Sequence, residues 1–123
     1  MSPLKINFLG AHTFAVTPPP PDKFGATTTS RSITLSWTQP YMEEFVQGYE
    51  IAYTYSVRGC SEVSPQVTVL INGSSVRSHT LLSSPQTPVE EDSVYNIFLA
   101  AINTAGIQSS KVLATAMTSQ AGT

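Results

Sequence analysis

The side chains that could perform catalysis are few and scattered along this 123-residue chain. It contains two histidines, His12 and His79, and one cysteine, Cys60. A serine hydrolase holds its nucleophile in a strained turn such as Gly-x-Ser-x-Gly, and the sequence has no such motif. A zinc site needs histidines and cysteines at short, clustered spacing, which is also missing. We therefore expect no catalytic residue, no metal and no cofactor, and we interpret His79 as a structural residue of a strand.

Two acidic runs, Glu43-Glu44 and Glu90-Glu91-Asp92, raise the question of calcium. Calcium sites alternate oxygen donors around a tight glycine turn, and neither run has that pattern. Both runs are expected to lie in solvated loops.

One modification motif and the cysteine remain. Asn72-Gly73-Ser74 is a glycosylation sequon at a turn signal, so Asn72 is a candidate glycosylation site if the chain is secreted. A single cysteine cannot form a disulfide within the chain. Cys60 is expected to be a reduced or partly buried thiol, with a disulfide to a neighbouring module as the alternative.

Charge and hydropathy exclude several partners. The net charge is −2 and the six basic residues are scattered, so nothing indicates binding to nucleic acid or anionic lipid. No apolar stretch approaches the roughly 20 residues of a membrane helix, so direct membrane insertion is not expected. The first 17 residues are too broken in hydropathy for a signal peptide. We expect the chain to be part of a longer protein.

The elements that position these residues are short segments of alternating polarity. They follow four prolines, Pro18 to Pro21, which favour a stiff, extended spacer. No helical period is apparent, and turn signals separate the segments. Seven strands are predicted, over or within residues 24–28, 32–38, 48–55, 66–73, 78–82, 94–106 and 111–118. This pattern predicts an all-β sandwich.

Alternation within the strands also predicts which side chains form the core. Residues at every second position of a strand share a face of the sheet. The large apolar side chains on the inward positions are the predicted structural core: Leu35, Trp37, Tyr49, Tyr95 and Leu99. Phe98 and Ile102 fall on the outward positions of the strand that contains Tyr95.

Taken together, these spacings resemble a fibronectin type III domain. The family pattern has Trp followed by Pro three residues later, then aliphatic-x-Gly-Tyr, then a SYTL-like run, then Tyr-x-aliphatic-x-aliphatic-x-Ala-x-Asn before a Gly. The matching residues are Trp37 and Pro40, then Val46, Gly48 and Tyr49, then Ser78 to Leu81, then Tyr95, Ile97, Leu99, Ala101, Asn103 and Gly106. Departures are a long segment between Leu81 and Tyr95, Val89 where the family usually has Leu, and His79 in place of an aromatic.

The resemblance implies a seven-stranded immunoglobulin-like β-sandwich of fibronectin type III topology. It covers residues 18–118, leaving 1–17 as a linker or disordered extension and 119–123 as a tail. Tyr95 would then bond to the backbone of the preceding bend, as a tyrosine corner. Asn103 and Gly106 would shape the last hairpin, with a positive φ at Gly106.

The function that the resemblance implies is non-catalytic. We expect an extracellular or cell-surface module of an adhesion or receptor protein, monomeric in isolation, that binds protein partners or spaces neighbouring modules in a tandem array. Two alternatives stay open: an accessory spacer of a secreted enzyme such as a glycoside hydrolase, and an intracellular muscle-type structural module. The candidate partner contact is Phe98 with Ile102, on an outer surface that Ala52 and Thr54 are expected to share.

Overall fold

A computed structural model of the protein describes residues 17–120. The extension predicted over residues 1–17, apart from Thr17, lies outside the described residues. His12 and residues 121–123 of the predicted tail also lie outside them.

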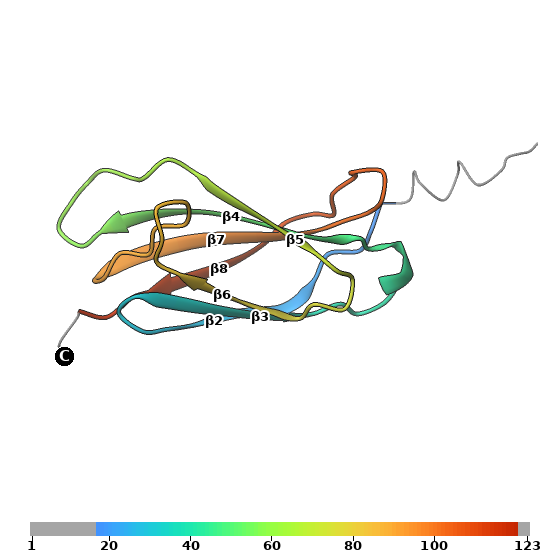
Figure 1. The fold of residues 1–123 in the computed structure, drawn as a ribbon, viewed down its shortest axis with the longest axis horizontal. Coiled ribbons are helices and arrows are strands. Elements are labelled where there is room, and N and C mark those ends of the chain that lie inside the picture. The colour runs from blue at the N-terminus through green and yellow to red at the C-terminus, as the bar shows by residue number, and fades with distance from the viewer. Residues whose placement is uncertain (1–16, 121–123) are drawn as a thin grey trace, which may run out of the picture.

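Seven strands form two antiparallel sheets. One sheet has the order β2-β3-β6 and the other has the order β5-β4-β7-β8. The elements are β2 (Asp22–Thr28), β3 (Ser32–Thr38), a short 3-10 helix η1 (Glu43–Phe45), β4 (Gly48–Val57), β5 (Val67–Asn72), β6 (Ser78–Leu82), β7 (Ser93–Ile102) and β8 (Val112–Met117). Figure 1 shows the two sheets as stacked layers. The predicted all-β, seven-stranded sandwich is confirmed.

The described chain runs from one end of the sandwich to the other. Figure 1 shows its blue first residues at one end of the long axis and its red last residues at the opposite end.

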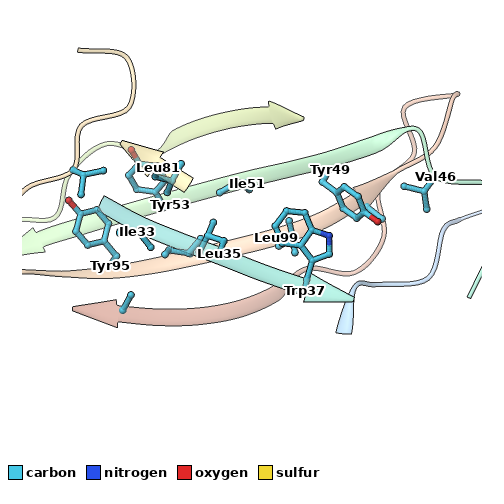
Figure 2. Packing of buried hydrophobic residues seen from close by; sticks show 14 residues of the cluster. Ile33, Leu35, Trp37, Val46, Tyr49, Ile51, Tyr53, Leu81, Tyr95 and Leu99 are labelled. Atoms are coloured by element: carbon cyan, nitrogen blue, oxygen red, sulfur yellow. The ribbon is translucent and has the colours of Figure 1, made fainter. Parts of the chain in front are cut away.

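The core fills the space between the two sheets because inward positions alternate along each strand. Ile33, Leu35 and Trp37 of β3 are buried, and the residues between them are exposed. Figure 2 shows Trp37 lying across the core toward Tyr49, and their ring centroids are 5.2 Å apart. The five predicted core residues, Leu35, Trp37, Tyr49, Tyr95 and Leu99, are all buried.

The proline run packs against the domain. It is not the separate extended spacer that its composition had suggested. Pro18, Pro19 and Pro21 are buried, and the side-chain amide of Gln39 donates a hydrogen bond to the Pro19 carbonyl at 3.1 Å. The prolines therefore pack against one end of the sandwich.

A polar cluster holds the same end together. The Tyr49 hydroxyl donates to Gln39 Oε1 at 3.1 Å and accepts from Arg77 Nη1 at 3.2 Å. Arg77 also donates to the Ser74 carbonyl at 2.6 Å and forms an ion pair with Glu43. Burial raises the pKa of Tyr49, and the Arg77 charge opposes that rise.

The acidic runs lie at the surface, with Glu43, Glu44 and Glu90 exposed, and three of their carboxylates form ion pairs there. Glu43 pairs with Arg77, Glu91 Oε2 lies 3.3 Å from Arg31 Nη2, and Asp92 Oδ1 lies 2.8 Å from Arg58 Nε. Each of these carboxylates contacts an arginine that is distant in sequence, and spacing within the runs could not reveal this.

Candidate functional site

The outer face of the four-stranded sheet carries the predicted partner contact. Strand register places Ala52 of β4 opposite Phe98 of β7, and Phe98 opposite Leu113 of β8. Thr68 of β5 lies opposite Ala52 on the other side. These four residues form one row across the sheet, from edge to edge.

This row exposes apolar side chains. Phe98 is 39% exposed and Leu113 is 54% exposed. Leu70 on β5 is 69% exposed but lies in another row, opposite Glu50. We call the neighbouring pair Phe98 and Leu113 the outer apolar patch. A partly exposed aromatic ring at an outward position, with an exposed apolar neighbour, is a surface that can anchor a protein partner.

Ala52 and Thr54 share the outer surface with Phe98, as expected, because the register places them opposite Phe98 and Asn96. Ala52 is only 3% exposed, since its short side chain lies between Phe98 and Thr68 in register. Thr54 is half-buried. Ala52 therefore lies beside Phe98 without offering contact area of its own.

Ile102 lies apart from the Phe98 row. It is half-buried and lines a shallow pocket of about 170 Å³ with Gly48 and Leu70, among others. Gly48 is required here, since a Cβ on it would lie 2.1 Å from the Ile71 carbonyl oxygen. Phe98 and Ile102, the predicted pair, therefore lie on the same face of the sheet but in different rows.

Leu113 was missed as a contact residue by the sequence reasoning. The signal was present, because Leu113 falls on an outward position of an alternating strand. Recognising it required knowing that β8 lies beside β7 in the sheet.

Tyr95 has the geometry expected of a tyrosine corner. The Glu90 backbone N–H donates to the Tyr95 hydroxyl at 2.5 Å, and the ring stacks on Tyr55 at 5.1 Å. Burial raises the pKa of Tyr95 to about 12. The adjacent Tyr53 hydroxyl donates to the Pro88 carbonyl at 3.0 Å. Both tyrosines therefore fasten the long segment between β6 and β7, whose Val89 is also buried in the core.

The last hairpin is shaped as predicted. Asn103 Oδ1 accepts from the backbone N–H groups of Ala105 and Ile107, both at 2.9 Å. Gly106 has φ of 83°, which confirms the predicted positive φ.

The remaining candidate residues lie far apart. Asn72 is exposed at the end of β5, followed by Gly73 with φ of 124°. Cys60 is exposed, whereas a partly buried thiol was one expectation. His79 is half-buried and lies opposite Leu35 in the sheet register. Within residues 17–120 no group of three or more His, Cys, Asp or Glu side chains could hold a metal ion.

A second shallow pocket lies where the described chain leaves the sandwich. It is lined by Arg58, Asp92, Met117 and Ser119, among others, and has a volume of about 450 Å³. The Arg58–Asp92 ion pair forms part of its wall.

In the described part of the chain, no helix is long and apolar enough to cross a membrane.

Comparisons with known proteins bear on the fold. No family model matches the sequence, and no curated protein does. Solved structures do match. The chicken CNTN1 FN1–FN3 domains share 20% identity at a TM-score of 0.61, over 85% of this chain and 32% of theirs. The third fibronectin III domain of the human KIAA0343 protein shares 15% identity at a TM-score of 0.60, over 89% of this chain and 92% of that one.

A third match is described as "Myokine structure", with 22% identity and a TM-score of 0.59, over 85% of this chain and all of that chain. Domains from titin also match, at 15% identity and a TM-score of 0.56, and the chain spans about a third of that fragment's length. At these identities the likeness shows the fold alone. The chain has the fibronectin type III fold, as its sequence motifs had indicated.

Proposed function

We propose that this domain is a non-catalytic module that binds a protein partner through the outer face of its four-stranded sheet. The observation that carries the proposal is the outer apolar patch of Phe98 and Leu113, two exposed side chains that lie opposite each other on neighbouring strands of that sheet. An aromatic ring fixed in a strand offers contact area with little loss of side-chain entropy on binding.

The same proposal includes a place in a tandem array at the cell surface. The two ends of the described chain lie at opposite ends of the sandwich, which suits end-to-end joining (Figure 1). The CNTN1 and titin structures that share the fold each contain several domains by their descriptions. The exposed sequon at Asn72 favours the extracellular form of the proposal over the muscle-type alternative.

A matched pair of variants tests the binding face. The protein would be screened against a panel of purified ectodomains, and each hit would be measured with Phe98→Ser and with Leu82→Ser. Leu82 is 65% exposed on β6 of the other sheet, so it controls for loss of any exposed apolar side chain. We expect Phe98→Ser to weaken binding at least about fivefold, which corresponds to about 1 kcal/mol. Leu82→Ser should bind as the wild type does. If both variants lowered the affinity equally, or if neither lowered it, the proposed binding face would be wrong.

The glycosylation part of the proposal has its own test. Expression through a eukaryotic secretory pathway should yield a protein whose mass falls by one N-glycan in Asn72→Gln. Identical masses for the two proteins would contradict extracellular processing of this site.

A further inference from the structure

Strand β5 forms one edge of the four-stranded sheet. It pairs with β4 on one side, and within residues 17–120 no strand pairs with its other side. An open edge presents backbone N–H and C=O groups that can pair with another strand.

The hydrogen bonds that flank β5 show which residues face this open edge. Both backbone groups of Tyr55 point toward the β5 side, since its N–H donates to Ser64 Oγ at 2.9 Å and its carbonyl accepts from the Ser64 N–H at 2.8 Å. Along an antiparallel strand this direction alternates from residue to residue. Tyr49, Ile51 and Tyr53 therefore also direct their backbone groups toward β5, and their partners on β5 are Ile71, Val69 and Val67. The intervening residues of β5, which are Thr68, Leu70 and Asn72, direct their backbone groups outward.

β5 lacks the devices that protect edge strands in most proteins. Its six residues include no charged side chain and no proline, and its register with β4 is unbroken. The edge strand β2 carries Asp22 and Lys23 and has an irregular register at that point. The edge strand β8 is held beside β2, where Thr28 Oγ1 donates to the Met117 carbonyl at 2.8 Å.

We propose that two copies of this domain associate through antiparallel pairing of their β5 strands, which joins their four-stranded sheets into one continuous sheet. A two-fold axis at Leu70 places Leu70 opposite Leu70 of the second copy and Thr68 opposite its Asn72. All three outward-directed residues of each strand then gain backbone partners, and the exposed Leu70 side chains of the two copies cover each other. Because the strand carries no charge, a second copy approaches it without like-charge repulsion.

The proposed dimer differs from the monomer expected from the sequence. The contact consists of one short strand pair and two leucines, so it lies at the small end of specific interfaces. Association is therefore weak and depends on protein concentration, as suits a module held at high local density in an array. A glycan on Asn72 would stand at this edge and oppose the pairing.

Sedimentation of the unglycosylated 123-residue chain from about 10 µM to about 1 mM tests the proposal, because weak dimers form across this range. The exposed Cys60 is replaced by Ser in all samples, so that a disulfide cannot produce the dimer. We expect the average mass to rise from that of the monomer toward twice that value. A monomer throughout the range would overturn the proposal.

Three variants locate the contact. Thr68→Pro removes an outward N–H that the sheet does not use, so it is expected to fold and to weaken association at least about tenfold. Leu70→Lys is expected to weaken it similarly by placing two charges opposite each other. Leu113→Lys changes a comparably exposed leucine on the other edge of the sheet and should leave association unchanged.

Association that survives in Thr68→Pro or Leu70→Lys would overturn the proposal, as would unfolding of Thr68→Pro or loss of the dimer in Leu113→Lys. Phe98→Ser should dimerise normally, which keeps this result separate from the proposed partner-binding face.

Discussion

Replacing Tyr95 by Phe removes the hydroxyl of a buried ring, which exchanges hydrogen bonds with the backbone N–H and carbonyl of Glu90. The ring contacts to Tyr53 and Tyr55 remain, with centroid separations of 5.7 Å and 5.1 Å. What disappears is the hydroxyl that accepts from the Glu90 N–H at 2.5 Å. The loss in free energy of unfolding therefore measures how much this hydroxyl contributes to holding the segment between β6 and β7 on the core.

The size of the destabilisation depends on the Glu90 backbone N–H, which loses its hydrogen-bond acceptor when the hydroxyl is removed. A buried donor left without a partner costs about 1–3 kcal/mol. Residue Glu90 is itself exposed, so water can reach part of its backbone, and we expect about 1–2 kcal/mol of destabilisation. Tyr53→Phe is the matched control. It leaves the Pro88 carbonyl without its side-chain donor, and an under-satisfied carbonyl costs less than an orphaned N–H.

Urea denaturation of wild type, Tyr95→Phe and Tyr53→Phe would measure these free energies of unfolding. The expected order is wild type, then Tyr53→Phe, then Tyr95→Phe as the least stable, with unchanged m-values. A free energy of unfolding for Tyr95→Phe within about 0.5 kcal/mol of the wild-type value would refute the assigned role of the hydroxyl.

Three further predictions concern the core and the sheet. Trp37→Ala should cost about 3–5 kcal/mol by opening a cavity against Tyr49, and a urea melt showing less than about 1 kcal/mol would contradict the observed packing. Gly48→Ala should cost more than about 3 kcal/mol because its Cβ would meet the Ile71 carbonyl, whereas Gly25→Ala, with no atom within 4 Å of a Cβ, should change stability little. Equal melting temperatures for these two glycine variants would contradict the close strand approach. Stability should fall as the pH rises from about 10 to about 12, because an unfolded tyrosine loses its proton near 10 while burial holds the Tyr95 proton in the folded state up to about 12. The urea midpoint measured across this pH range checks the sign, and a midpoint that rises would contradict it.

The strands and the core could be predicted from the sequence because period-two alternation is a local signal. The strand at Ser32–Thr38 and the strand at Ser78–Leu82 have the predicted bounds, since turn residues or proline limit both. Trp37, Tyr49 and Tyr95 occupy inward positions for the same local reason.

Features that depend on contacts between distant residues could not be predicted in this way. The ion pair of Asp92 with Arg58 and the burial of Ala52 under Phe98 both require knowing which strands lie side by side. The open edge at β5 is a property of strand order, and the sequence of β5 alone does not distinguish an edge from a centre. The burial of Pro18 and Pro19 likewise depends on where the chain meets the sandwich.

The measurement that tests the central claim most directly is the comparison of stability and partner affinity in Phe98→Ser. Phe98 points away from the core on β7 and is 39% exposed, so the substitution should leave the melting temperature nearly unchanged. The same protein should bind its partner at least about fivefold more weakly than wild type. A folded variant with undiminished affinity would contradict the binding face, and an unfolded variant would show that Phe98 belongs to the core.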